Sequence, residues 1–249
     1  MYFHDVHILI YAVIAVIGFG VGSFVNWMNY RFLAEKKIFT KEIFQKKADY
    51  KSNIVLSIIV SIIYVLLLYK FGIGKTFLSN LNLIKCLVLT PMILSAFVID
   101  FKEQIIPNRL NLTIFESGLV LLFAAGIFNI NIAISMFFGM LVGGGTFLLI
   151  TLIGGLIAGK EAMGFGDVKL MAGLGLYFGL ANIVLVTLVS FLLGAIISII
   201  LLITKVRKTS EYIPFGPFIV LGCFIVMFVP FKTILSLLVT IFSLGLMHI

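Results

Sequence analysis

The sequence predicts an all-α, polytopic membrane bundle of about eight transmembrane helices. Of the 249 residues, 62% are hydrophobic and only 11% are charged, and the mean hydropathy is +1.24. A soluble chain of this length could not bury so much apolar side-chain surface. The sequence has no recognisable internal repeat and no low-complexity linker, so we interpret residues 1–249 as a single membrane domain.

Eight apolar windows account for the predicted number of spans, because about 20 apolar residues suffice to cross the bilayer core as a helix. We expect spans at residues 7–28, 53–69, 83–99, 110–128, 132–157, 168–180, 183–204 and 215–229. Window 168–180 is short and rich in glycine, which favours a tilted, partly unwound or buried segment. The apolar tail 233–249 is either a ninth span or an interfacial helix. Glycines spaced four apart, such as Gly139 and Gly143, permit close helix crossings.

The Lys and Arg residues predict how these spans are oriented. Fourteen of the 18 fall on one side of the predicted bundle, seven of them in the segment 31–51. Because cytoplasmic loops carry an excess of Lys and Arg, this side should be cytoplasmic and the N-terminus outside. We therefore expect a multi-pass protein of the cytoplasmic (inner) membrane. The net charge of +8 then indicates contact with membrane lipid and not with nucleic acid.

Two acidic residues at the ends of apolar windows are the candidate catalytic residues. Asp100 ends the third window, and Asp167 follows Gly164 and Gly166 at the start of the sixth. In the predicted topology both acids lie at cytoplasmic ends of spans. Ionisable residues within or beside membrane spans are costly and usually mark functional sites. Each acid alone would also fit a simpler role, Asp167 as a helix N-cap and Asp100 as a charge-paired helix end.

A pair of carboxyl groups at one membrane depth predicts a particular chemistry. If the fold brings the two acids together, they cannot both ionise readily, and one proton is shared between them. One carboxylate can then deprotonate a water molecule while the other, protonated, polarises a peptide carbonyl. Paired acids near glycine-broken helices would also suit a proton- or cation-coupled transporter. Their predicted position at one face, and not at the midplane, argues for the protease.

Four motifs in a fixed order resemble the type IV prepilin leader peptidases, which are membrane aspartic proteases of the GxGD type. The motifs are G-S-F-V-N (22–26) with a following Arg31, D-F-K-E-Q-I-I-P-N (100–108), K-E-A-M-G-F-G-D-V-K-L-M-A (160–172) and I-P-F-G-P-F (213–218). The resemblance implies that Asp100 and Asp167 are the catalytic pair. It also implies that the partners are type IV prepilin or pseudopilin precursors, whose basic leader is cleaved after a glycine at the cytoplasmic membrane face.

Further residues of these motifs are candidates for substrate binding or support of the active site. They are Gly164, Gly166, Lys169, Pro214, Gly216 and Pro217. The glycines admit backbone conformations closed to other residues and leave room for a substrate. The prolines interrupt a helix start, which would free backbone groups for an extended substrate or simply form an interfacial turn. Lys169 either pairs with a carboxylate or extends to the membrane interface.

The same family resemblance raises the question of methyl transfer. Many family members methylate the new N-terminus with S-adenosylmethionine, and the candidate region here consists of Gly22, Ser23, Asn26 and Arg31. Many members also carry two cysteine pairs in the first cytoplasmic loop, a zinc-binding module, whereas segment 31–52 contains no cysteine. We therefore expect no zinc, no metal ligands and no cofactor for proteolysis, with S-adenosylmethionine needed only if the chain methylates.

Overall fold

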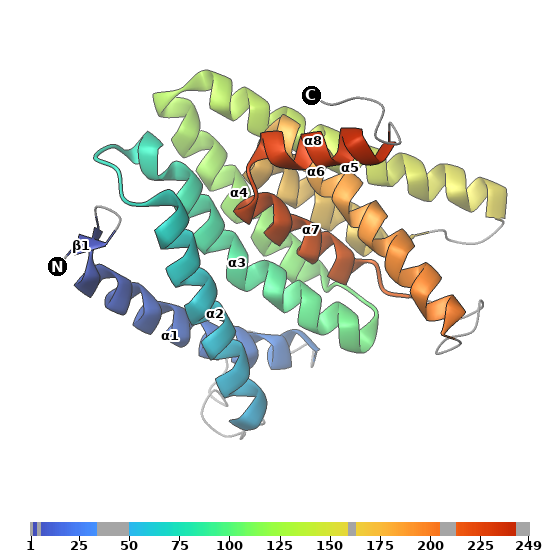
Figure 1. Ribbon diagram of the computed structural model, residues 1–249. Coiled ribbons are helices and arrows are strands. Elements are labelled where there is room, and N and C mark those ends of the chain that lie inside the picture. The colour runs from blue at the N-terminus through green and yellow to red at the C-terminus, as the bar shows by residue number, and fades with distance from the viewer. Residues whose placement is uncertain (1, 4–5, 34–49, 159–162, 205–212, 243–249) are drawn as a thin grey trace.

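The computed structural model is an all-α bundle, which confirms the predicted class. It describes residues 2–3, 6–33, 50–158, 163–204 and 213–242. A small antiparallel pair, β1 (Tyr2–Phe3) and β2 (Val6–His7), precedes the helices (Figure 1). The helices are α1 (Ile8–Leu33), α2 (Tyr50–Phe71), α3 (Phe77–Glu103), α4 (Asn108–Phe128), α5 (Ile130–Ala158), α6 (Phe165–Ile203), α7 (Gly216–Phe228) and α8 (Phe231–Phe242).

The predicted number of eight spans is approximate. Six described helices are long and apolar enough to cross a membrane, and α7 with α8, bent by 119°, would make a seventh if they form one broken span. Windows 168–180 and 183–204 both belong to the single 39-residue helix α6. The 12 residues of α8 reach only about 18 Å. The described part of the tail is therefore too short to be a ninth span by itself.

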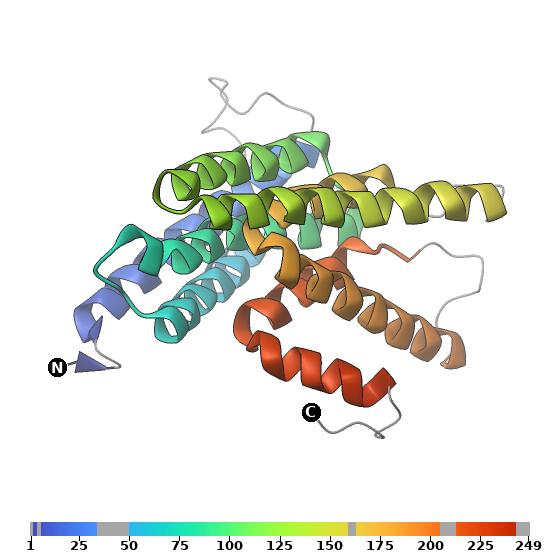
Figure 2. The same cartoon turned by 90° about the horizontal axis from the view of Figure 1, so that it is seen from above.

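Helix α6 turns at Gly179, which explains why the sequence predicted two spans there. Gly179 has φ 71° and ψ 176°, a conformation that side-chain-bearing residues rarely adopt. The N–H of Leu180 donates a hydrogen bond to Ser135 Oγ at 3.2 Å, in place of a regular helical partner. Figure 2 shows α6 doubling back, so its two arms extend toward the same end of the bundle. The short window is thus the first arm of a bent helix.

Glycines allow the closest helix contacts, as their spacing predicted. A Cβ atom on Gly139 of α5 would lie 2.5 Å from the carbonyl oxygen of Gly175 in α6. A Cβ on Gly22 of α1 would lie 2.4 Å from Ser57 Cα in α2. At such distances any side chain would force the helices apart, so these glycines are sites of direct backbone packing.

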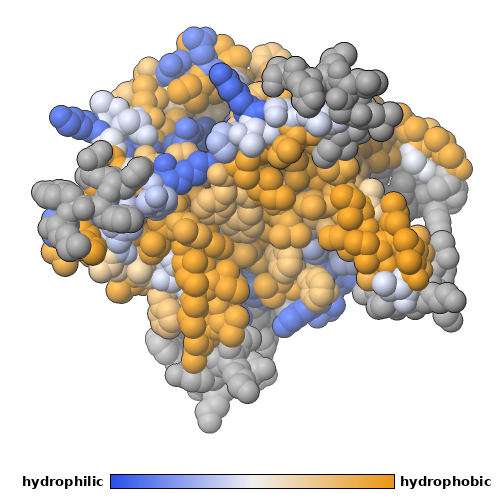
Figure 3. Space-filling view, viewed as in Figure 1, coloured by the Kyte–Doolittle hydropathy of each residue, from blue (hydrophilic) through white to orange (hydrophobic). Residues whose placement is uncertain are grey.

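The core lies where α3, α4, α6 and α7 meet, and much of the remaining surface is apolar. Ile93, Leu110, Leu174 and Ile219 are completely buried there. By contrast, Leu156 is 85% exposed, and many other large apolar side chains are also exposed to a smaller extent. The face in Figure 3 is largely hydrophobic, with hydrophilic residues gathered in limited patches. Such a surface suits a lipid environment and supports a multi-pass membrane protein.

Candidate active site

Asp100 lies in the last turn of α3 and is 4% exposed. The helix ends shortly after it, at Glu103. Gln104 adopts a left-handed conformation with φ 58°, and its N–H donates a hydrogen bond to the Asp100 carbonyl oxygen at 2.9 Å. A non-helical connection then leads to Pro107, the N-cap of α4, as the sequence predicted. Asp100 therefore sits on a regular helix immediately beside a chain reversal.

Asp167 lies in the first turn of α6 and is also 4% exposed. The N-cap of this helix is Gly164, which offers no capping side chain, and the N–H of Asp167 donates to the Gly164 carbonyl oxygen at 3.1 Å. The alternative role of Asp167 as N-cap is therefore wrong. A carboxylate in the first turn is favoured by the helix dipole, but here it points into the buried interior and not toward solvent.

The fold brings the two acids together from helices that are far apart in sequence. Both carboxyl groups are buried, and they lie close enough for the negative charge of one to disfavour ionisation of the other. A third element completes the site, because the backbone N–H of Gly216 at the start of α7 donates a hydrogen bond to Asp100 Oδ2 at 2.9 Å. Figure 1 shows α7 running alongside α3. Two buried carboxyl groups in such proximity can share a proton.

The sequence left three roles open for the turn before α7: substrate binding, support of the active site or a plain interfacial turn. Pro214, Gly216 and Pro217 are all buried, and Pro217 belongs to the first turn of the helix. The N–H of Gly216 is already used by Asp100. A Cβ on Gly216 would lie 2.5 Å from Asp100 Oδ2, so only glycine permits this approach. This turn orients a catalytic candidate from inside the protein.

Gly166 allows close packing and does not adopt an unusual backbone conformation. Among the residues that the structure describes, only Gly72 and Gly179 are glycines with positive φ, and Gly164 has φ −69°. A Cβ on Gly166 would lie 3.3 Å from Ile106 Cβ, in the connection that follows Asp100. The glycine thus lets the two motifs that carry the acids pack against each other.

Asn111 of α4 is a supporting residue that the sequence did not single out. Its Nδ2 donates a hydrogen bond to the Gly166 carbonyl oxygen at 3.1 Å, and its side chain is 3% exposed. Its Oδ1 is buried and has no partner. The sequence feature that could have identified Asn111 is its position as a polar amide within the apolar window 110–128. Asn111 fixes the turn that precedes Asp167.

Lys169 is exposed and does not pair with a carboxylate in the described chain. Its Nζ donates instead to Asn108 Oδ1 at 2.7 Å, joining α6 to the start of α4. The two residues border a mainly apolar groove of about 390 Å³, which also includes Asn111, Leu112, Phe115 and Ala172. An apolar groove thus lies between α4 and the first turns of α6, and Asp167 itself does not line it.

The candidate methyl-transfer residues lie at the crossing of α1 and α2. Gly22 packs on the backbone of Ser57, and Ser23 Oγ shares a hydrogen bond of 2.8 Å with Ser57 Oγ. Asn26 is half-buried on the same helix, and Arg31 belongs to its last turns. Near this end of α1, Ser95 of α3 donates a hydrogen bond to the buried Asn29, which the sequence did not identify.

Several predicted features fall outside the described residues. They include most of the basic segment 31–52, namely 34–49, and the acidic residue Glu161. Within the described residues, no group of three or more His, Cys, Asp or Glu side chains could hold a metal ion. Cys86 and Cys223 are both buried and are not joined in a disulfide.

Comparison with known proteins links both acids to one family. Residues 87–199, which contain Asp100 and Asp167, match the model of the type IV leader peptidase family. A prepilin leader peptidase/N-methyltransferase of Xanthomonas campestris is 30% identical over 172 residues, 69% of this chain and 56% of that protein. A protein of the same name from Pseudomonas aeruginosa is 33% identical over 55% of this chain and 46% of its own length. One from Escherichia coli is 31% identical over 53% of this chain and 57% of its own length.

The chain thus spans about half the length of the curated relatives that it matches. No solved structure matches it. The matched region carries both aspartates, the connection after Asp100 and the glycine turn before Asp167. On this evidence the chain belongs to the type IV leader peptidase family.

Proposed function

We propose that this protein is an integral-membrane aspartic endopeptidase that removes the leader of type IV prepilin-like precursors at the cytoplasmic membrane face. The observation that carries the proposal is the buried pair of Asp100 and Asp167, with Asp100 held by the N–H of Gly216. A proton- or cation-coupled transporter is not favoured, because both acids sit at helix ends and the matched family is one of peptidases.

The geometry supports a general acid–base mechanism. One carboxylate removes a proton from a water molecule, whose oxygen attacks the scissile carbonyl carbon. The other carboxyl group donates its proton to the developing oxyanion. The C–N bond then breaks as the first carboxyl group passes the proton taken from water to the leaving amine, and a hydroxyl of the intermediate returns a proton to the second carboxylate. The hydrogen bond from Gly216 fixes the plane of the Asp100 carboxyl group, so it is oriented before substrate arrives.

The groove beside Lys169 supports a membrane substrate whose apolar segment follows the cleaved bond. Its lining is mainly apolar, and it begins next to the turn that carries Asp167. A helix of the precursor could lie along α4 and α6 there while its basic leader remains in the cytoplasm. Most Lys and Arg residues are predicted to lie on the same side of the membrane as the two aspartates, which agrees with a cytoplasmic leader.

The decisive test is cleavage of a prepilin-type precursor by the purified protein. Asp100→Asn and Asp167→Asn should each reduce turnover by at least about 1,000-fold, since an amide neither accepts nor supplies the required proton. Glu103→Gln is the matched control, because it removes an exposed acid from the same end of α3. Equal activity of either Asn variant and the control would exclude the pair as the catalytic centre.

The cytoplasmic position of this end can be tested independently. A cysteine introduced at Ser52, in a chain where the buried Cys86 and Cys223 are replaced by alanine, should react only with reagent that reaches the cytoplasm. Labelling by a membrane-impermeant reagent in intact cells would place the catalytic end on the outer side.

Methyl transfer is proposed to be weak in this chain. Gly22 and Ser23 are engaged in packing against Ser57, so by themselves they leave no cradle for S-adenosylmethionine at that crossing. We infer that these residues have kept a mainly structural role, and that no zinc orders the first loop. The test is mass analysis of the cleaved product after incubation with S-adenosylmethionine. Complete addition of one methyl group would show that this inference is wrong.

A further inference from the structure

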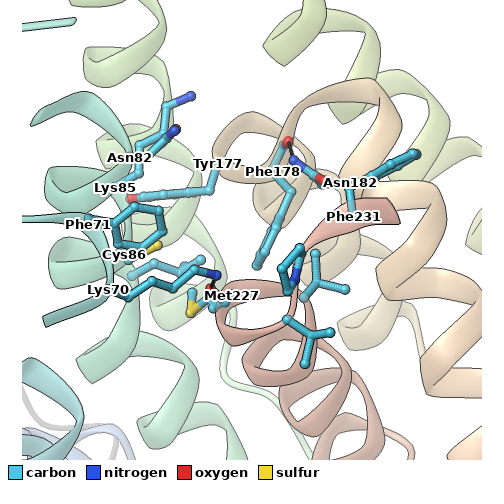
Figure 4. Close-up of a pocket in the computed structure, with 14 residues that line it drawn as sticks. Lys70, Phe71, Asn82, Lys85, Cys86, Tyr177, Phe178, Asn182, Met227 and Phe231 are labelled. Atoms are coloured by element: carbon cyan, nitrogen blue, oxygen red, sulfur yellow. Dashed lines mark hydrogen bonds between the residues drawn. The ribbon is translucent and has the colours of Figure 1, made fainter. Parts of the chain in front are cut away.

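A second polar cavity lies at the opposite end of the bundle from the aspartates. Its volume is about 200 Å³, and it is bounded by the end of α2, the start of α3, the bend of α6 and the junction of α7 with α8 (Figure 4). Lys85, which lines it, lies 15 residues before Asp100 on α3, or about 22 Å along the helix. The cavity is therefore separate from the catalytic pair.

Lys85 is a buried cation without a counter-ion. Its side chain is 7% exposed and lines the cavity. Within the described residues it has neither an ion pair nor a hydrogen bond to its Nζ, and no Asp or Glu lines the cavity. Glu116 is exposed on another helix, α4, and makes no ion pair with it. The Nζ of Lys85 is not sealed inside the protein and opens on the cavity. An ammonium group in such an enclosed place is stabilised by a bound anion or by loss of its charge.

A second lysine contributes to the same cavity. Lys70 is the penultimate residue of α2, and its Nζ donates a hydrogen bond to the carbonyl oxygen of Met227 near the end of α7. This contact uses one of the three protons of the ammonium group and does not neutralise its charge. Figure 4 shows Lys70 and Lys85 on the same wall of the cavity, facing Phe178, Asn182 and Phe231. The cavity is thus lined by two lysine side chains.

The start of α8 adds to the attraction for an anion. Pro230 and Phe231 line the cavity, and the 12-residue helix begins at Phe231. The N–H groups of Thr233 and Ile234 donate to the Pro230 carbonyl oxygen, whereas those of Phe231 and Lys232 come before the first helical hydrogen bond and lie at the positive end of the helix dipole. Two lysines and the start of α8 therefore line one cavity, and none of the described residues that line it is a carboxylate.

We propose that this cavity binds a phosphate group, supplied by the head group of an anionic phospholipid. The cavity lies at an end of the apolar spans, where head groups reside, and Lys70 is at the last turn of its helix. The adjacent α8 is strongly two-sided: Ile234 and Leu238 are buried on the protein, while Leu237 is 56% exposed. A lipid could place its phosphate in the cavity and its chains along this exposed apolar face. The proposal does not depend on peptidase activity.

The proposal can be tested on the full chain, purified in a neutral detergent. Thermal melting is measured with added phosphatidylglycerol and with phosphatidylcholine, for the wild type, Lys85→Met, Lys70→Met and Lys75→Met. Phosphatidylglycerol should raise the melting temperature of the wild type by about 3 °C or more beyond phosphatidylcholine, since it binds only the folded protein. Both cavity variants should lose this difference. Lys75→Met, which removes an exposed lysine from the same end of the bundle, should retain it.

The same measurements identify the source of the phosphate and the outcomes that would overturn the site. Stabilisation by millimolar inorganic phosphate that depends on Lys85, with no preference for phosphatidylglycerol, would assign a free anion and contradict the lipid. An undiminished lipid difference in both cavity variants would exclude the cavity. If Lys85→Met does not fold, Lys70→Met and Lys85→Arg test the site instead. Lys85→Arg should keep the difference in melting temperature between the two lipids, and Lys70→Met should lose it. Native mass spectrometry of retained phosphatidylglycerol provides an independent readout.

Discussion

The backbone N–H of Gly216 donates a hydrogen bond of 2.9 Å to Oδ2 of Asp100, 116 positions earlier in the chain. This contact ties the start of α7 to the last turn of α3. Asp100 thereby has a hydrogen-bond donor from the backbone, and not from a side chain. The position of Asp100 therefore depends on the absence of a side chain at residue 216.

Gly216→Ala should impair cleavage strongly. The new Cβ would lie 2.5 Å from Asp100 Oδ2 and 3.0 Å from its Cγ, so the carboxyl group or the start of α7 must move. Because a displacement of about 1 Å can cost 100-fold, we expect kcat/KM to fall by about that factor. The control is Gly20→Ala, whose Cβ would meet no atom within 4 Å. Equal kcat/KM in both variants would show that the contact does not orient the site.

Substitutions of Gly166 should show a graded loss of activity. The Cβ of alanine would lie 3.3 Å from Ile106 Cβ, a distance that a small shift of Ile106 can relieve. Leucine needs far more space and should separate the turn of Asp167 from the connection after Asp100. We expect a loss below about tenfold for Gly166→Ala and above about 100-fold for Gly166→Leu in precursor cleavage. Full activity of the leucine variant would mean that the two motifs do not need to touch.

Asn111→Leu should lower activity more than it lowers stability. The variant loses the hydrogen bond to the Gly166 carbonyl, but it also removes a buried Oδ1 that has no partner, and these effects on folding partly cancel. One hydrogen bond corresponds to about tenfold in rate, so we expect kcat/KM to fall by about that factor. Thr113→Val, which loses only a bond to a carbonyl of its own helix, is the control. A large drop in melting temperature without loss of rate would contradict the positioning role.

Gly139→Leu should destabilise the bundle. A Cβ at this position would lie 2.5 Å from the Gly175 carbonyl oxygen and 2.7 Å from the Gly179 carbonyl carbon, both rigid backbone atoms. Separating α5 from α6 should cost about 3 kcal/mol, at the upper end for overpacking. Gly145→Leu, in the same helix with open space around its Cβ, should melt like the wild type. Equal melting temperatures for both variants would show that this crossing tolerates separation.

Local features of the sequence were sufficient to predict much of the architecture. The apolar windows identified α1 to α5 and both arms of α6, because a helix needs about 20 apolar residues to cross a bilayer whatever its neighbours are. The rarity of acids in such windows pointed to Asp100 and Asp167. The glycine-rich window 168–180 indicated a break near residue 180, and the chain does turn at Gly179.

Contacts between distant segments were decided only by the tertiary structure. The sequence left open whether Pro214, Gly216 and Pro217 bind substrate, support the active site or form an interfacial turn, and only the fold shows that Gly216 holds Asp100. Asn111 and the cavity of Lys70 and Lys85 were not predicted, because an amide or a lysine in an apolar window reveals no partner until the helices pack. Hydrophobicity and periodicity act within one helix, whereas each of these contacts depends on the rotation and depth of one helix against another.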